Sequence, residues 1–265
     1  MTRSVFLFPF AALFFLLAGH SASPSQAPPR VIQVFVALAD NQHQGIVPVP
    51  ARLGDGEDPS GNLYWGAAFG VKTFFRRSAN WRLVSCARGP KTAILERCVF
   101  RHRTGAVYLI ADAYRGSQIR TAVTDFLLAS AGLDPETLSL GPDTSGTPLM
   151  VGGAADLVAY VGHDAFMDFQ VPPILGNKRQ RSRAAIILAC GSKVYFAPYM
   201  KDAGAYPLLW TTGLMAPEAY TLKAALDGWI AREDGRAIRE LAAEAYSKYQ
   251  KCGLLGAQKL FSTGW

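Results

Sequence analysis

The sequence predicts an α/β fold in which a mainly parallel β-sheet is flanked by helices. Short aliphatic or β-branched runs alternate with amphipathic stretches along most of the chain, which is the order of strands and helices in such folds. Two runs, residues 31–39 and 184–189, are apolar almost throughout, as strands covered on both faces require. The composition, 50% hydrophobic with 25 glycines and 16 prolines, excludes a disordered chain and a coiled coil.

The first half of the chain is expected to hold a central strand, two helices and a hairpin. Apolar residues of 63–77 recur at helical spacing before two arginines, whose charge suits a helix C-terminus. Residues 103–105 separate two β-rich runs and predict the hairpin turn. The expected elements are a strand at 31–39, a long loop to Asn62, a helix at 63–77, strands at 81–86, 94–101 and 106–113, and a helix at 117–131.

The second half begins with a turn-rich stretch, residues 134–153, and then returns to alternating strands and helices. The expected elements are a strand at 156–162 ending at His163, a strand at 184–189 ending at Cys190, a short helix at 195–203, a strand at 208–211, and helices at 217–232 and 235–250. Since the sequence has no internal repeat and no interdomain linker, we expect one domain over residues 31–265.

The first 23 residues are expected to be a secretory signal. A basic residue, Arg3, precedes an apolar run at 5–18 and small residues at 19–23. A retained membrane anchor is the alternative, but the run is shorter than the roughly 18 residues that a spanning helix needs. Residues 24–30 contain three prolines and predict a flexible leader. The mature protein is therefore expected in the periplasm or outside the cell, with no stable membrane association.

The net charge of +7 and the pI near 9.3 would suit an acidic partner, but the sequence does not favour nucleic acid. Much of the local charge lies in one stretch, residues 178–183, which lacks interleaved aromatic residues and is expected to be a solvated loop or a processing site. No His, Cys and Asp cluster has metal-ligand spacing, and no Gly-rich phosphate loop is present. We therefore expect neither a metal nor a cofactor.

Two strand ends carry the residues that point most directly to chemistry, His163 and Cys190. Ligands of an open parallel sheet bind at the carboxyl ends of its strands, so the two side chains would emerge together if their strands are neighbours. A thiol beside an imidazole is a nucleophile with its general base. The structural alternative is a buried core cysteine and a histidine that only bonds a backbone carbonyl.

The backbone N–H groups of Asp164 and Cys190 are candidates to hold an oxyanion. Around them the chain reads Val161-Gly162-His163-Asp164 and Leu188-Ala189-Cys190-Gly191-Ser192. This pattern resembles the caspase-like cysteine peptidases (caspases, legumains, gingipains, separases and bacterial CHAT domains). The resemblance implies a caspase-like three-layer sandwich, with His163 as general base and acid and Cys190 as nucleophile. Asp164 stands where that superfamily usually has glycine, and its side chain is expected to narrow the cleft and add charge beside His163.

Several residues are weaker candidates for contact with a substrate. Asn41, Gln42 and His43 follow the first strand, and the resemblance implies that this loop helps to build the pocket for the residue before the scissile bond. A polar, solvent-facing loop is the alternative. Thr212 ends a later strand and is a candidate cleft wall. Asp168 is a candidate partner for a basic substrate side chain, with an ordinary loop carboxylate as the favoured alternative. The segment 217–218 is expected to be the first turn of a helix, without chemistry.

The pairing of the four cysteines stays open at this point. Cys86 and Cys98 lie on adjacent β-rich segments and could form a disulfide, which would leave Cys190 and Cys252 free. A bond between Cys190 and Cys252 would instead exclude the nucleophile.

The expected function is that of an exported cysteine-type endopeptidase that acts on a peptide or protein with a His163–Cys190 dyad. The alternative is a non-catalytic caspase-like domain that binds a peptide, a glycan or a partner protein in the same crevice.

Overall fold

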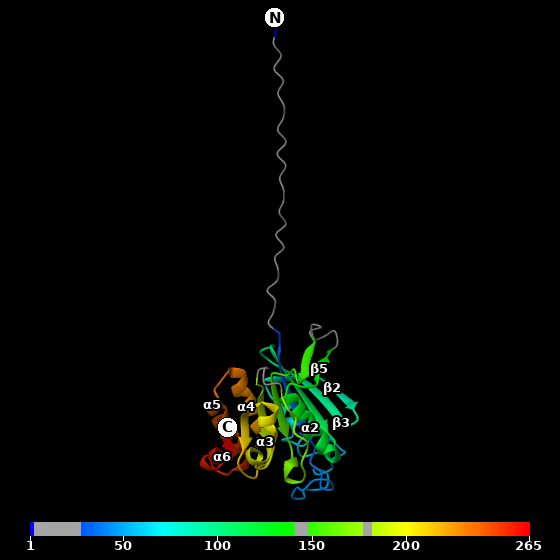
Figure 1. Cartoon of the computed structure of the whole chain (residues 1–265), viewed down its shortest axis with the longest axis vertical. Coiled ribbons are helices and arrows are strands. Elements are labelled where there is room, and N and C mark those ends of the chain that lie inside the picture. The colour runs from blue at the N-terminus through cyan, green and yellow to red at the C-terminus, as the bar shows by residue number, and fades with distance from the viewer. Residues whose placement is uncertain (3–27, 141–147, 177–181) are drawn as a thin grey trace.

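The computed structural model describes residues 1–2, 28–140, 148–176 and 182–265 (Figure 1). The predicted signal segment, residues 1–23, lies almost entirely outside this part, as do residues 24–27 of the leader and most of the basic stretch 178–183. Within the described ranges, no helix combines the length and the apolar character needed to cross a bilayer.

Eight strands form one sheet, in the order β10-β9-β8-β7-β1-β4-β3-β2. The neighbours β4-β1, β1-β7, β7-β8 and β8-β9 are parallel, whereas β2-β3, β3-β4 and β9-β10 are antiparallel. The strands are β1 (Arg30–Ala37), β2 (Trp81–Lys91), β3 (Ile94–His102), β4 (Val107–Tyr114), β7 (Leu157–Val161), β8 (Ala184–Leu188), β9 (Tyr206–Thr211) and β10 (Phe261–Ser262). The predicted α/β fold with a mainly parallel sheet is confirmed.

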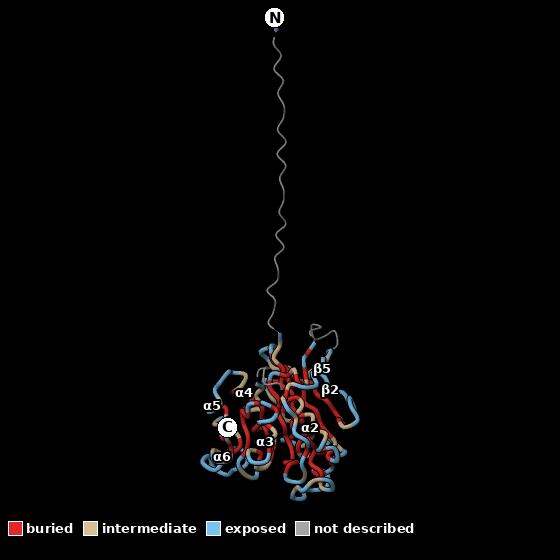
Figure 2. Tube along the Cα trace, in the orientation of Figure 1, coloured by how far each residue is buried: buried red, intermediate tan, exposed pale blue. Residues whose placement is uncertain are grey.

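Helices cover both faces of the sheet and make three layers (Figure 1). Strand β1 shows why: Ile32, Val34 and Val36 belong to one apolar core, and Val31 and Phe35 belong to the other. One face packs against α1 (Val71–Arg77), α4 (Ala219–Ala231), α5 (Gly235–Gln250) and α6 (Leu254–Leu260), and the other against α2 (Ile119–Ser130) and α3 (Ser192–Ala203). Figure 2 shows the buried residues concentrated in the strands between these layers.

The helix expected at 63–77 is wrong in its first half, because only α1 is helical. Residues before it fold back in turns, and the Val71 N–H donates to the Tyr64 carbonyl at 2.8 Å. Gly70 has an extended backbone and lies against Trp65, where a Cβ would be 2.4 Å from the Trp65 carbonyl carbon. The apolar spacing therefore does not mark one helical face: Leu63 and Ala67 are partly buried and Phe69 is exposed, whereas the buried residues of the turns are Tyr64 and Trp65.

Short elements were missed by the sequence prediction. The turn-rich stretch 134–153 contains a hairpin of β5 (Pro135–Leu138) and β6 (Leu149–Gly152), and the C-terminal end of the chain adds α6 and β10. The helix expected at 117–131 begins as the 3-10 helix η1 (Gly116–Gln118) and continues as α2. Such elements are too short for a periodic pattern to stand out in the sequence.

The disulfide joins Cys86 and Cys98, which face each other as paired residues of β2 and β3 with a Cα–Cα distance of 4.1 Å. Cys190 and Cys252 are free. The alternative pairing of Cys190 with Cys252 is therefore excluded, and Cys190 keeps a thiol that can react.

Removing the disulfide, by dithiothreitol or by the double change Cys86→Ser and Cys98→Ser, is expected to lower the free energy of unfolding by about 2–3 kcal/mol. The bond closes a loop of 12 residues and so restricts the unfolded chain. Urea unfolding followed by tryptophan fluorescence measures the loss. The variant Cys252→Ser, which removes an exposed free thiol, is the matched control and should unfold like the parent. An unfolding midpoint unaffected by reductant would contradict the prediction.

Candidate active site

His163 and Cys190 emerge at the same edge of the sheet from neighbouring parallel strands. Val161 of β7 pairs with Leu188 of β8, so each of the two residues lies two positions beyond a paired residue. Parallel neighbours are about 4.8 Å apart, which puts both residues at the same level of the carboxyl edge. Both line one cavity.

Two glycines let the chain turn at these strand ends. Gly162, directly before His163, lies so close to β1 that a Cβ would be 2.9 Å from the Ala37 carbonyl oxygen. Gly191, directly after Cys190, has a φ of 61°, a left-handed conformation that glycine adopts at low cost, and it caps the start of α3. Because Gly191 turns the chain directly after Cys190, β8 ends sharply and Cys190 lies in the crevice at the carboxyl edge.

Asp168 orients the ring of His163. The His163 side chain is 7% exposed, and its Nε2 lies 2.8 Å from Asp168 Oδ2. The same carboxylate oxygen accepts the Gly45 N–H at 3.0 Å, which ties the loop after β1 to the histidine. Tyr160 donates its hydroxyl to the His163 carbonyl at 2.9 Å. With Nε2–H directed at Asp168, Nδ1 is left to accept a proton. Asp168, a predicted substrate contact, is thus placed behind the histidine.

The thiol of Cys190 contacts the loop after β9. Its Sγ lies 3.5 Å from the Met215 carbonyl oxygen and 3.4 Å from the Met215 nitrogen. In the described part of the chain it makes no hydrogen bond to His163. His163 and Cys190 therefore line one cavity without a hydrogen bond between them in this conformation.

The two expected oxyanion donors are the backbone N–H groups of Asp164 and Cys190. Among the described residues, neither the Asp164 nor the Cys190 backbone N–H donates to a backbone carbonyl. Each follows its strand end directly at the carboxyl edge, where donors that remain unpaired in the fold can bind a developing negative charge.

The expectation that the Asp164 side chain narrows the cleft is wrong. This side chain is fully buried, and its Oδ1 accepts the Phe166 N–H at 3.0 Å as the cap of the 3-10 helix η3 (Ala165–Met167). Its Oδ2 has no partner among the described residues. Burial raises the pKa of this carboxyl to about 7, with a further contribution from the charge of Asp168.

The cavity at His163 and Cys190 has a volume of about 410 Å³, a size typical of small-ligand and side-chain pockets. It is built by the loops that follow β1, β7, β8 and β9. Its lining residues are Gly45, Ile46, Val47, Val49, Leu63, Tyr64, Gly162, His163, Met167, Cys190, Leu214, Met215, Ala216, Pro217, Glu218 and Gln250. Four loops of one sheet edge therefore converge on the two reactive side chains.

The remaining predicted substrate contacts do not line this cavity. Asn41 holds its own loop together, because its side chain donates to the Val49 carbonyl at 2.8 Å and accepts the Val49 N–H at 3.0 Å. Gln42 is exposed, and the ring of His43 bonds Asp40 at 2.9 Å.

Thr212 lies toward the sheet edge at β10, where its hydroxyl donates to the Lys259 carbonyl at 2.8 Å. The loop after β1 does contribute to the cavity, but through residues 45–49 and not through residues 41–43.

Three polar side chains of the cavity were missed: Tyr64, Glu218 and Gln250, the last residue of α5. Glu218 is not in the first turn of a helix, as expected, but is the N-cap residue of α4. Its position after the strand ending at Thr211 could have marked it, because that strand ends at the same edge. Nothing in the sequence placed Tyr64 there, since it comes from the turns before α1.

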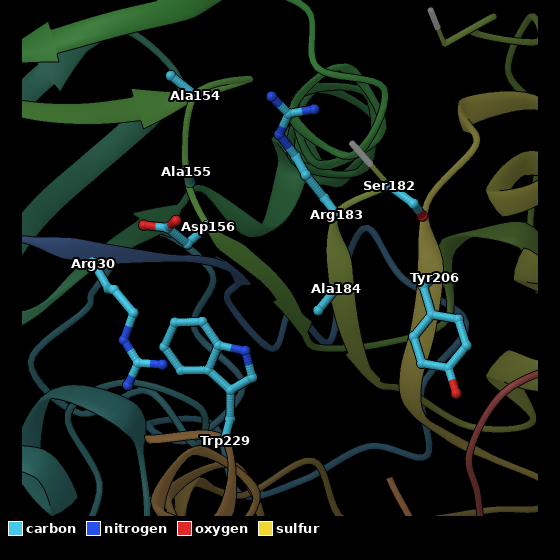
Figure 3. Close-up of a pocket in the computed structure, with 9 residues that line it drawn as sticks. All are labelled: Arg30, Ala154, Ala155, Asp156, Ser182, Arg183, Ala184, Tyr206 and Trp229. Carbon is cyan, nitrogen blue, oxygen red and sulfur yellow. The ribbon is translucent and has the colours of Figure 1, made fainter. Parts of the chain in front are cut away.

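A second cavity, of about 540 Å³, lies at the opposite edge, where the parallel strands begin (Figure 3). Arg30, at the start of β1, lies over the ring of Trp229 at 4.2 Å, and Asp156 accepts the Val31 N–H at 2.7 Å. None of the described residues that line it is a cysteine or a histidine. His163 and Cys190 line the cavity at the carboxyl edge instead.

One group of three potential metal ligands occurs in the described part of the chain, namely Cys86, Glu96 and Cys98. Its two thiols are joined in the disulfide, so they are not available as thiolates. Comparisons with protein-family models, with curated proteins and with solved structures find no match to this chain.

Asp164→Asn is expected to stabilise the protein increasingly as the pH rises. The pKa of Asp164 is about 7 in the folded protein against an ordinary 3.8, so folding retains a proton that the unfolded chain releases. Stability due to this group is complete below about pH 4 and is lost as the pH approaches 7. The amide carries no charge and keeps an oxygen to accept the Phe166 N–H.

Urea unfolding at pH 5 and pH 8 tests this prediction. The advantage of Asp164→Asn over the parent should grow between these values by on the order of 2 kcal/mol. Asp202→Asn, at an exposed position of α3, is the control and should show no such trend. Parallel pH profiles for Asp164→Asn and the parent would show that the buried carboxyl does not hold a proton.

Proposed function

We propose that this protein is a cysteine-type peptide hydrolase in which Cys190 is the nucleophile and His163 the general base and acid. The observation that carries the proposal is the convergence of His163 and Cys190 on one cavity at the carboxyl edge, with Asp168 orienting the imidazole. The order of a strand ending in histidine and the next strand ending in cysteine also supports a caspase-like relationship, which remains part of the proposal.

The proposed reaction has two steps, formation of a thioester on Cys190 and its hydrolysis, and His163 moves a proton in both. His163 Nδ1 takes the thiol proton, and the Cys190 thiolate attacks the carbonyl carbon of the substrate amide. The N–H groups of Asp164 and Cys190 donate to the oxygen that becomes negatively charged. The C–N bond then breaks, and His163 gives its proton to the leaving amine. Water, deprotonated by His163, hydrolyses the resulting thioester and restores the thiol.

The thiol must leave Met215 before this reaction can begin. Its contacts with the Met215 backbone, at 3.4 and 3.5 Å, occupy the sulfur on the side of the loop after β9. Leu214 of that loop is largely exposed. A substrate backbone that bonds this loop would release Sγ toward the imidazole.

The same contact favours a second candidate function, that of a binding domain. If Cys190 stays bonded to Met215, the crevice accepts a peptide without cleaving it. The variant Cys190→Ala should then bind as tightly as the parent, and no peptide should be cleaved by either.

An oxidising compartment is the proposed setting, either the periplasm or the exterior of the cell. The disulfide between Cys86 and Cys98 supports it, because such bonds persist mainly outside the cytosol. The N-terminal sequence, with its apolar run at 5–18, supports it independently.

Cys190 of the parent protein is expected to label with an electrophilic peptide probe at neutral pH, and to do so at least tenfold faster than in His163→Ala. The imidazole raises the thiolate fraction, so its removal slows alkylation. Intact-mass spectrometry under non-reducing conditions measures the label. Cys252→Ser is the control and should leave the rate unchanged. Equal labelling rates for His163→Ala and the parent would contradict the proposed His163–Cys190 dyad.

Turnover is measured by digestion of a proteome-derived peptide library, with Cys190→Ala as the blank. Asp168→Asn is expected to lower kcat about 10- to 100-fold, because the imidazole loses the charge that orients it and stabilises its protonated form. Asp202→Asn should retain the parent rate. An unchanged kcat and pH profile for Asp168→Asn would show that Asp168 has no part in the reaction.

A further inference from the structure

We propose that Glu218 makes the cavity beside Cys190 a site for a long cationic side chain, that of lysine or arginine, in the bound peptide. This inference rests on the proposed function only in taking this cavity as the place where the substrate binds. It assigns the substrate class, which the positions of His163 and Cys190 leave open.

The lining of the cavity suits an aliphatic stem. Most of it is apolar, and the side chains that supply this surface are Ile46, Val47, Leu63, Leu214, Met215 and Pro217. Lysine and arginine bury the methylenes of their side chains along such surface while keeping the charged end at a polar partner. In the described part of the chain no lysine or arginine lines the cavity, so none of these residues competes with the cation there.

Among the described residues that line the cavity, Glu218 supplies the one carboxylate. One of its oxygens, Oε2, accepts the Tyr220 hydroxyl at 2.8 Å and the Gln250 side-chain amide at 3.1 Å. Both donors are neutral. The other oxygen, Oε1, accepts no hydrogen bond from a described residue, and Glu218 forms no ion pair within the described ranges.

A carboxylate in this state favours a cationic ligand on electrostatic grounds. Glu218 is partly buried, and this burial raises the pKa of its carboxyl despite the two hydrogen bonds that it accepts. Its charge is therefore poorly solvated, and an incoming ammonium or guanidinium would supply the missing ion-pair partner. An acidic side chain of the ligand would be repelled by the Glu218 carboxylate.

Glu218 also lies on the same cavity as the proposed nucleophile. Cys190, Glu218 and the buried Tyr64 all line it. Cys190 Sγ contacts the backbone of Met215, three residues before Glu218 in the loop after β9. A cationic side chain held by Glu218 would belong to a residue near the scissile bond, and not to a distant part of the peptide.

The test uses Cys190→Ala, which binds without turnover, and two pairs of fluorescein-labelled peptides. Within each pair one residue differs, lysine against norleucine or arginine against citrulline, so that shape is kept and charge is removed. Fluorescence anisotropy should show the charged peptides binding about tenfold more tightly or better. Adding Glu218→Gln should remove this preference, because the amide keeps an oxygen for Tyr220 and Gln250 but has no charge.

Adding Glu233→Gln to Cys190→Ala is the matched control, since Glu233 is an exposed glutamate outside the cavity. This double variant should bind the lysine and arginine peptides in preference to their uncharged partners as strongly as Cys190→Ala does. Equal affinities within each pair, no binding of any of the peptides, or a preference that survives Glu218→Gln would each overturn the inference.

The same peptides given to the parent protein separate the two proposals. Cleavage without a preference for lysine or arginine would leave the peptidase standing and remove the role of Glu218. A charge preference in binding that depends on Glu218, with no cleavage by the parent, would support the cationic site and remove the peptidase.

Discussion

The parallel register of β7 on β8 is the constraint on which the rest of the candidate site depends. Because Val161 pairs with Leu188, the two strands end at one level, and His163 and Cys190 leave the sheet together. A slip of one residue would turn alternate side chains to the other face of the sheet and pull the two reactive groups apart. The side chains on both faces of β7 and β8 are buried at every position but Ala184 and oppose such a slip.

The loops at this edge are joined to one another by polar contacts, and not only by the strands beneath them. Asp168 bonds both His163 and the Gly45 N–H, so the loop after β1 and the loop after β7 share one carboxylate. Cys190 bonds the backbone of Met215 in the loop after β9. These contacts position His163 and Cys190 through different loops, and occupation of the crevice can therefore act on both.

The parts of the molecule that could be predicted from the sequence are those with a repeating pattern or a local rule. The strands at 31–39, 156–162 and 184–189 follow from buried apolar runs, and His163 and Cys190 follow from the rule that strand ends carry ligands. The helix at 63–77 failed in its first half because apolar residues in a series of turns, some of them exposed, can recur at helical spacing by chance. Glu218 was missed because an acidic residue at the start of a helix is explained by helix stability alone. Its type therefore did not show that its side chain lines a cavity.

Alone, the sequence determined the alternation of strands and helices, and it placed a histidine and a cysteine at two strand ends, since burial patterns are local properties of the chain. Only the tertiary structure decided which groups meet. It paired Asp168 with His163 and left Asn41 to hold its own loop. It also buried Asp164 away from the cleft and turned Glu218 into it. Contacts between loops far apart in sequence depend on how the layers pack, which no local pattern records.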